Sequence, residues 1–318
     1  MVRQIQMQKS NMPFDGFEIR EWQTYDGTRL TYYVMGKRSA PPMVIANGLG
    51  GNMLAWRHFI RYFARHFRVY IWDYRGLFQS DAPKDCNSYS IPHHSQDLES
   101  LLDHEGIQSP LLVGWSMGVQ VILEFFRTYP NRARAFVALN GTHGYPLRTA
   151  FYSNVREKRF EQVFKFVQKH WHRAVWIRPH VTRTSIMETF VRAIQAARIA
   201  GASLDRESFF DMASDFMHND LKIYSEIFQQ LGRHSAKDVL PNIQTPALIV
   251  AGSRDSFIPA YLSKEISQNI PHSEYWEIPG ATHFCPLEYP HTINHRIKQY
   301  LIKIGAMSEE VKALVKVA

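Results

Sequence analysis

The sequence predicts an α/β fold with a mostly parallel central sheet, helices on both faces of the sheet, and an inserted helical cap. Short runs rich in β-branched and aromatic residues alternate with longer segments of helical periodicity. Some short runs, such as residues 68–74, are apolar enough to be covered on both sides, as parallel strands are. The alternation stops over about 143–233, where several helical patterns occur without a convincing strand. Strand, helix, strand repeats of this kind build a parallel sheet.

Eight strands and five core helices are expected in chain order. The first two strands flank the turn Asp26-Gly27, and the first core helix has its large apolar side chains on one face. The expected strands cover 17–24, 29–35, 42–48, 68–74, 110–115, 134–141, 245–252 and 273–280. The expected helices cover 54–67, Ser90 or His93 to Glu105, 118–129, a segment from about Pro259, and 287–302. We therefore expect residues 1–142 and 234–318 to form the core and residues 143–233 to form the cap.

The composition is that of an ordinary globular chain that needs no metal or disulfide for stability. Its 318 residues are 45% hydrophobic, which is enough for a full core. The two cysteines, Cys86 and Cys285, have no metal-ligand spacing, so neither a disulfide framework nor a structural zinc site is expected. We find no apolar run long enough for a signal peptide or a membrane span. These features predict a cytoplasmic protein with reduced thiols.

The net charge of +8 is concentrated in one segment. Residues 145–200 carry 11 Lys and Arg against 3 Glu and no Asp, so the remainder of the chain sums to about zero. No zinc finger, RNA-recognition signature or basic arm accompanies this segment. The sequence therefore predicts no nucleic-acid binding.

The stretch LLVGWSMGVQVILEFF, residues 111–126, places a serine between two glycines at the junction of a strand and a helix. A buried strand ends at Trp115 and a helix begins near Met117, so Ser116 must lie on a tight turn that exposes its hydroxyl. The N-terminus of the helix adds unpaired N–H groups and a positive dipole end, which favour negative charge on a substrate oxygen. This context predicts a nucleophile.

A serine nucleophile needs a base and a group that orients the base. Asp255 follows the predicted strand 245–252, and His283 follows the predicted strand 273–280. The carboxyl ends of parallel strands meet at one edge of the sheet, where Ser116 is also expected. We therefore predict that His283 takes the proton of Ser116 and that Asp255 fixes the tautomer of His283.

Several motifs together resemble the α/β-hydrolase fold family over residues 17–142 and 234–304. They are NGLGG at 47–51, DYRGLFQS at 73–80, GWSMG, GSRDSFIP and PGATHF. The resemblance implies a catalytic triad of Ser116, Asp255 and His283, and an oxyanion hole formed by the backbone N–H groups of Leu49 and Met117.

Three positions depart from the family pattern. Asn47 stands where the family often has His, so the hydrogen-bond support of the oxyanion loop is an open question. Phe78 replaces a glycine of the Asp-x-Arg-Gly motif, and a bulky ring is expected to narrow the local space. Asn140 ends a strand where some relatives carry the acid, which favours Asp255 as the acid of the triad.

The serine at position 116 decides between branches of the family. Members that open epoxides or displace halide use Asp there, so these reactions are disfavoured. A serine predicts an esterase or lipase-like hydrolase that cleaves carboxylic esters through an acyl-enzyme, without cofactor or metal. Acyltransferases, thioesterases and carbon–carbon bond hydrolases share the same triad and remain alternatives. A non-catalytic binding protein on the same fold is the least favoured.

The cap is expected to select a small-molecule ester or lipid-like substrate. Residues 155–176 form a basic amphipathic pattern, whose apolar stripe either closes over the core or faces an acyl pocket. In the second case the basic side would attract an acidic group on the substrate or favour weak association with an anionic membrane surface. The predicted substrate contacts are Trp115, Phe164, Trp171 and Phe284. Surface or packing roles are expected for His104, His143, His218 and His291, and a core or pocket-lining role for Cys285.

Overall fold

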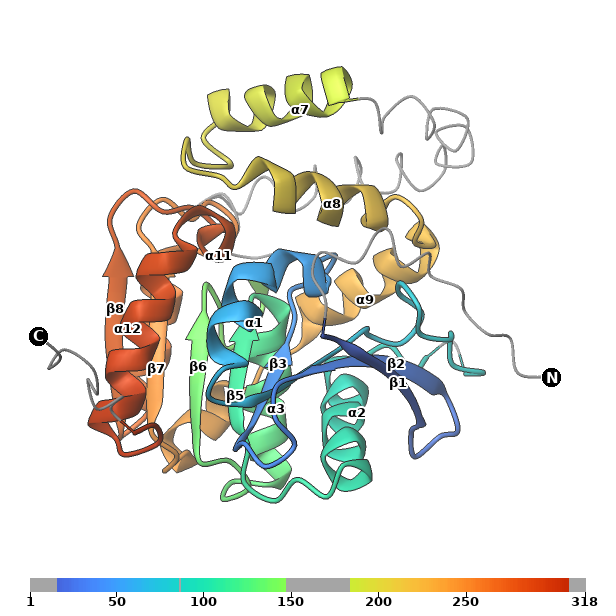
Figure 1. Ribbon diagram of the computed structural model, residues 1–318, viewed down its shortest axis with the longest axis vertical. Helices are drawn as coiled ribbons and strands as arrows, with labels where there is room; N and C mark the ends of the chain where they lie inside the picture. The colour runs from blue at the N-terminus through green and yellow to red at the C-terminus, as the bar shows by residue number, and fades with distance from the viewer. Residues whose placement is uncertain (1–15, 86, 147–183, 309–318) are drawn as a thin grey trace, which may run out of the picture.

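The computed structural model describes residues 16–85, 87–146 and 184–308, and an eight-stranded sheet organises them (Figure 1). The strand order is β1-β2-β4-β3-β5-β6-β7-β8. The β1 strand pairs antiparallel with β2, and β2 with β4, whereas all other neighbours are parallel. The strands are β1 (Glu18–Gln23), β2 (Arg29–Met35), β3 (Pro42–Ala46), β4 (Arg68–Trp72), β5 (Leu111–Trp115), β6 (Ala135–Leu139), β7 (Ala247–Gly252) and β8 (Ser273–Ile278). Each lies within its predicted range, so the predicted mostly parallel sheet is confirmed.

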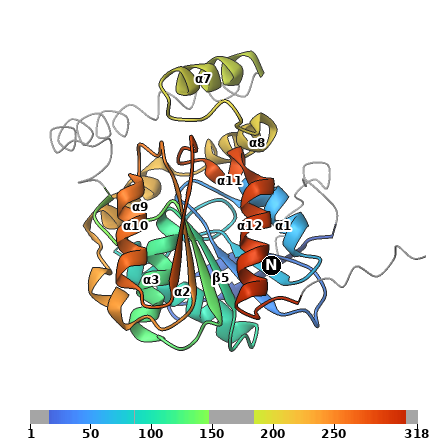
Figure 2. The ribbon, with the colours of Figure 1, turned by 90° about the vertical axis from the view of Figure 1, so that its left-hand side faces the viewer.

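Helices cover both faces of the sheet (Figure 2). One face carries α2 (Ile91–His104), α3 (Met117–Thr128) and α10 (Ala260–Asn269). The other carries α1 (Arg57–Phe63) and α12 (Pro290–Lys303). Shorter elements are the 3-10 helices η2 (Met53–Trp56) and η5 (Lys237–Asn242) and the single turn α11 (Cys285–Glu288).

Two helices differ from their predicted extents. The segment predicted as one helix over 54–67 is a 3-10 turn followed by α1, which ends at Phe63. The segment predicted over 287–302 is α11 and α12, separated at Tyr289. Pro290 explains the second break, because proline has no N–H to continue the hydrogen bonding of α11 and fits the first turn of a new helix.

Alternating side chains of the central strands supply two separate hydrophobic cores. Val44 and Ala46 of β3 pack with residues of α2 and α3. Met43 and Ile45 of the same strand pack with residues of α1 and α12. The strand is therefore buried on both faces, as its apolar sequence predicts.

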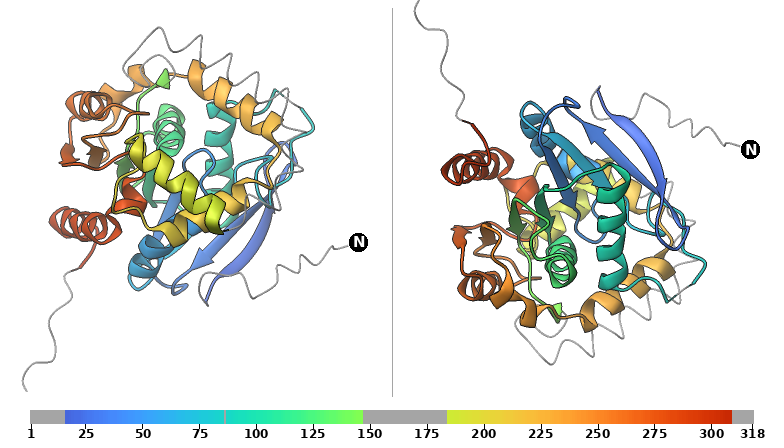
Figure 3. Two further views of the ribbon diagram at one scale, coloured as in Figure 1. Left: turned by 90° about the horizontal axis from the view of Figure 1, so that it is seen from above. Right: turned by 90° about the horizontal axis from the view of Figure 1, so that it is seen from below.

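Between β6 and β7 the described part of the chain forms three helices, α7 (Thr184–Ala196), α8 (Arg206–Phe216) and α9 (Leu221–Arg233). Of these, α7 and α8 lie above the carboxyl ends of the parallel strands and α9 lies to one side (Figures 1 and 3). The predicted basic helix over 155–176 lies outside the described residues. The division into a core and a cap of residues 143–233 stays a prediction. Among the described residues, no helix is both long enough and apolar enough to cross a bilayer.

Candidate active site

Ser116 occupies a sharp turn between β5 and α3. Its backbone has φ 54° and ψ −114°, and its N–H donates to the Leu139 carbonyl at 3.0 Å. The turn requires close packing: a Cβ on Gly118 would lie 1.9 Å from the carbonyl oxygen of Ala46. A Cβ on Gly114 would likewise lie 2.9 Å from the Gly118 carbonyl group. The two glycines therefore let α3 approach the sheet closely enough to place the serine at its edge.

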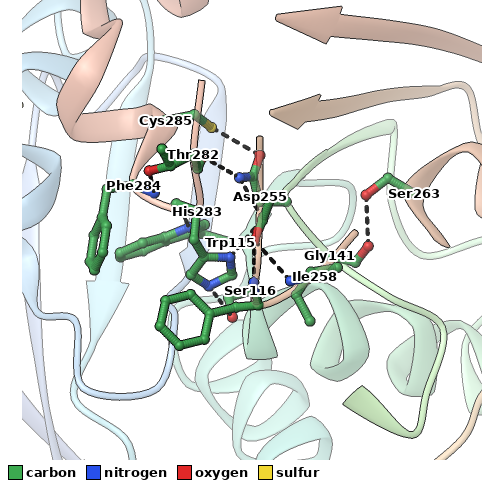
Figure 4. Close-up of polar contacts among 12 residues, drawn as sticks. Trp115, Ser116, Gly141, Asp255, Ile258, Ser263, Thr282, His283, Phe284 and Cys285 are labelled. Carbon is green, nitrogen blue, oxygen red and sulfur yellow. Dashed lines mark hydrogen bonds and ion pairs between the residues drawn. The ribbon is translucent and has the colours of Figure 1, made fainter. Parts of the chain in front are cut away.

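His283 lies between Ser116 and Asp255 (Figure 4). Its Nε2 is 3.0 Å from Oγ of Ser116, and its Nδ1 is 2.8 Å from Oδ2 of Asp255. A carboxylate only accepts, so Nδ1 carries the proton and Nε2 is free to accept the serine proton. The three residues follow β5, β7 and β8, as predicted for one edge of the sheet.

Asp255 is almost fully buried, with an exposed fraction of 1%, and both of its carboxylate oxygens accept hydrogen bonds. Oδ1 accepts from the N–H groups of Phe257 and Ile258 at 2.9 and 2.8 Å. Oδ2 accepts from Nδ2 of Asn140 at 2.8 Å in addition to His283. The carboxylate is held in one orientation by four donors from three loops.

Asn140 is a site residue whose role was not predicted from the sequence. Its backbone has φ 47°, which asparagine tolerates better than most residues. Besides Asp255, its Nδ2 contacts the Thr282 carbonyl at 2.7 Å, and its Oδ1 accepts from Sγ of Cys285 at 3.0 Å. Its place at the carboxyl end of β6 is the sequence signal that could have indicated this role. Cys285 is buried, which raises the pKa of its thiol and fits its predicted core role.

Asn47, at the position where the family often has histidine, holds the loop after β3 by hydrogen bonds. Its Oδ1 accepts from the Gly48 N–H at 2.8 Å and from Nε1 of Trp56 at 2.9 Å, and its carbonyl accepts from the Tyr74 hydroxyl at 2.7 Å. The open question about this departure is thus answered by an alternative set of hydrogen bonds. Leu49 follows in the same loop.

Met117 is the first residue of α3, so its N–H has no acceptor within the helix. This is the property that an oxyanion-hole donor requires.

Phe78 adopts φ 52°, a conformation that favours the glycine it replaces. Its N–H donates to Oδ1 of Asn219 at 2.5 Å, and its ring packs, partly buried, against the core on the α2 and α3 side. Because Asn219 lies between α8 and α9, the substituted position also contacts the segment above the sheet.

Aromatic rings surround His283. The ring centroid of Phe257 lies 5.2 Å from that of His283, and those of Trp115 and Phe284 lie at 5.9 and 6.2 Å. Trp115 is 4% exposed and donates from Nε1 to the His283 carbonyl at 3.0 Å. Phe209 of α8 packs on Phe284 at 5.5 Å. The predicted substrate contacts Phe164 and Trp171 lie outside the described residues, and substrate contact by Trp115 and Phe284 stays a prediction.

The four other histidines singled out in the sequence have contacts of their own. His104 packs on Tyr32, His218 contacts the Ser214 carbonyl, His143 lies beside Glu265, and His291 packs on His58. In the part of the chain that the structure describes, no group of three or more His, Cys, Asp or Glu is arranged to hold a metal ion.

Comparisons with known proteins agree with this architecture. A family model described as alpha/beta hydrolase fold matches residues 41–290. The chain is 23% identical over 282 residues to Epoxide hydrolase 3 of Mus musculus, covering 86% of this chain and 74% of the mouse protein. It is 22% identical over 282 residues to 3-oxoadipate enol-lactonase 2 of Acinetobacter baylyi, covering 89% of this chain and 96% of the lactonase. The solved structure of a thermophilic esterase from Thermogutta terrifontis is 21% identical, with a TM-score of 0.68, covering 90% of this chain and 99% of the esterase.

Proposed function

This chain is a hydrolase of the α/β-hydrolase fold family, and we propose that it is a serine hydrolase that cleaves carboxylic esters through an acyl-enzyme. The observation that carries the proposal is the placement of His283 between the Ser116 hydroxyl and the Asp255 carboxylate. Hydroxyl, imidazole and carboxylate in this order form the arrangement that activates a serine at neutral pH.

The reaction begins with attack of Ser116 Oγ on the ester carbonyl carbon while Nε2 of His283 takes the hydroxyl proton. Asp255 stabilises the imidazolium through Nδ1. The N–H groups of Leu49 and Met117 receive the oxyanion; one such donor typically contributes on the order of a hundredfold to a thousandfold in rate. His283 then protonates the leaving alcohol, and water releases the acid from the acyl-enzyme by the same steps in reverse.

An apolar or lipid-like acyl group is the substrate class that the surroundings favour. A Cβ on Gly50, next to Leu49, would lie 3.2 Å from the ring of Phe216 and 3.4 Å from that of Tyr224. These rings come from α8 and α9, and their centroids are 4.9 Å apart. The oxyanion loop therefore has aromatic side chains directly above it, and His283 has others beside it.

Lactone hydrolysis is a second candidate, because the similarity to the enol-lactonase covers nearly all of that protein. A lactone is a cyclic ester, so the same chemistry applies. Acyl transfer, thioester cleavage and carbon–carbon hydrolysis also remain compatible with the triad. Epoxide opening is disfavoured despite the similarity to an epoxide hydrolase, because a serine occupies the nucleophile position. A cytoplasmic location, and weak association with anionic membranes through the basic amphipathic segment 155–176 of the cap, remain part of the proposal.

Labelling with a fluorophosphonate tests the nucleophile. We expect covalent labelling at Ser116, located by peptide mass spectrometry, and its loss in Ser116→Ala. Turnover of p-nitrophenyl esters of increasing chain length tests the acyl group, because an apolar site should prefer chains longer than acetate. An unlabelled wild-type protein would exclude the proposed mechanism, and activity that falls steeply beyond acetate would exclude the apolar acyl group.

A further inference from the structure

Glu288 has a buried carboxylate that joins two loops. The residue ends α11 and is 5% exposed. Oε2 accepts from the Thr282 N–H at 2.8 Å, and Oε1 accepts from the Thr282 hydroxyl and from the Gly201 N–H, each at 2.6 Å. Thr282 directly precedes His283, whereas Gly201 lies between α7 and α8. One side chain therefore connects the loop that carries His283 to the segment above the sheet.

Two carbonyl groups of the His283 loop accept hydrogen bonds from residues of the core. Asn140 donates to the Thr282 carbonyl at 2.7 Å, and Trp115 donates to the His283 carbonyl at 3.0 Å. Trp115 is the last residue of β5 and Asn140 directly follows β6, so both of these donors come from the central sheet. Glu288 differs from both because it also bonds the α7–α8 connection.

Three hydrogen-bond donors stabilise the buried carboxylate of Glu288. Among the described residues it forms no ion pair with Lys, Arg or His, so N–H and O–H groups alone replace the water it loses on burial. A shift of Gly201 would remove one of these donors and change where the carboxylate rests. A second bond, from the Asp205 N–H to the Leu287 carbonyl at 2.9 Å, ties α11 to the start of α8 in the same region.

We propose that Glu288 is a positioning residue for His283, and that through Gly201 it makes the placement of the general base depend on the position of the α7–α8 connection. The inference rests on the proposed serine hydrolase function, because it concerns the base of that reaction. Proton transfer requires Nε2 close to Oγ, and small displacements of a reacting group cost on the order of a hundredfold in rate. The residue acts through Thr282 and touches no substrate.

Two substitutions test the Glu288 side and the Gly201 side of this connection separately. Glu288→Gln preserves the size of the side chain but has one acceptor oxygen, so it cannot accept from both Thr282 groups and Gly201. Gly201→Ala leaves every polar group in place, but its Cβ would lie 3.0 Å from Cδ and Oε1 of Glu288, which must move by a few tenths of an ångström. We expect Glu288→Gln to lower kcat for p-nitrophenyl esters and the fluorophosphonate labelling rate by about tenfold to a hundredfold. KM should change little, and Gly201→Ala should show a smaller loss of the same kind.

Ile297→Val is the matched control for lost stability, because Ile297 is fully buried in the neighbouring α12. It should lower Tm without lowering kcat. If Glu288→Gln does not fold, Thr282→Val takes its place; it removes the hydroxyl contact to Glu288 together with the bond that this hydroxyl accepts from the Phe284 N–H at 3.3 Å. In the double variant Gly201→Ala/Glu288→Gln, the losses should combine to less than the product of the single losses, because both act on one carboxylate.

Two results would overturn the inference while leaving the proposed function intact. One is Glu288→Gln with wild-type kcat and labelling rate. The other is independent, multiplicative losses in the double variant, which would remove the connection to Gly201. Failure of the wild-type protein to label at Ser116 is a different result and would overturn the proposed function itself.

Discussion

Ser116 places a reactive hydroxyl in a backbone conformation that is unfavourable for any residue with a Cβ. Its φ of 54° is maintained by the bond from its N–H to Leu139 and by the packing of α3 against β3 at Gly118. Such conformations cost on the order of 1–3 kcal/mol and persist where the surrounding structure fixes them. The strain directs Oγ out of the sheet and toward His283.

Substitution of Ser116 by glycine should therefore stabilise the fold while it abolishes activity. Glycine adopts positive φ without strain, although the freedom it adds to the unfolded chain offsets about 0.5–1 kcal/mol of the gain. We expect a net increase of about 1 kcal/mol in the free energy of unfolding, measured by urea denaturation. Ser116→Ala is the control, since it removes the hydroxyl and keeps the Cβ. Equal stabilities of the two variants would show that the turn is not strained.

The hydrogen-bonded arrangement of Ser116, His283 and Asp255 could be predicted from the sequence because each of the three lies in a local motif next to a recognisable strand. Asn140 and Glu288 could not be assigned in the same way. Their roles depend on contacts across the fold, 115 positions from Asn140 to Asp255 and 87 from Gly201 to Glu288. A polar residue at a strand end indicates only that it lies near the site, and its partners are decided by how the loops pack.

At the scale of elements, the loop that follows β4 contains a buried carboxyl group. Asp73 is 3% exposed; its Oδ2 accepts from the Tyr33 hydroxyl at 2.9 Å and from the Gln79 N–H at 3.2 Å. The Ser80 hydroxyl closes the loop by donating to the Asp73 carbonyl at 2.7 Å. Burial raises the pKa of Asp73 from 3.8 to about 7, and the nearby carboxyl of Asp215 on α8 acts in the same direction.

This shift predicts a dependence of stability on pH. A carboxyl group with a higher pKa in the folded chain stabilises the fold fully below pH 4, and the contribution is lost as the pH rises toward 7. Asp73→Asn keeps an acceptor for Tyr33 and removes the titration. The free energy of unfolding of the wild type should therefore fall relative to the variant between pH 4 and 7, by up to about 1.4 kcal/mol per pH unit. Urea denaturation across this range measures the difference.

Ser80→Ala provides the comparison for the pH experiment. It removes two buried hydrogen bonds of the same loop, to the Asp73 carbonyl and from the Thr31 N–H, without removing a titrating group, so it should lower stability by a similar amount at every pH. Parallel pH profiles for the wild type and Asp73→Asn would contradict the raised pKa.

The elements themselves differ in how far the sequence predicts them. The central strands were predicted because a short apolar, β-branched run between turn signals is typical of a buried strand, and the edge strands β1 and β8 because short β-rich runs lie next to turn residues. Helix ends were predicted less well. The apolar spacing over 287–302 continues across the break at Tyr289, and Pro290 permits either a new helix or a kink. In the structure a new helix begins at Pro290, and α11 packs against the His283 loop. The spacing of apolar residues carries no information about this contact.

At the scale of the whole molecule, α8 is attached to the core by a row of acidic side chains. Asp205 lies 2.8 Å from His58, and Asp215 accepts from Asn52 at 2.8 Å. Arg57 pairs with both Glu207, at 2.8 Å, and Asp211. These contacts hold α8 where Phe209 packs on Phe284, the residue after His283, and where Phe216 lies against the loop at Gly50. The position of the α8 helix itself should thus govern substrate binding, whereas the chemical step should depend on the preceding connection at Gly201.

Arg57→Met tests this division, because methionine keeps the apolar contacts of the buried stem and removes both ion pairs. We expect KM for long-chain p-nitrophenyl esters to rise several-fold, whereas kcat and the labelling of Ser116 by a small fluorophosphonate stay close to wild type. The loss in stability should be within about 1 kcal/mol, since side-chain exposures of 81% for Glu207 and 47% for Asp211 keep both carboxylates in contact with water. Arg192→Met on α7 is the matched control, because the Arg192 side chain is 73% exposed and lies 3.9 Å from Glu188 within the same helix. If both variants leave KM unchanged, the attachment of α8 does not shape the substrate site; if Arg57→Met lowers kcat instead, α8 acts on the triad itself.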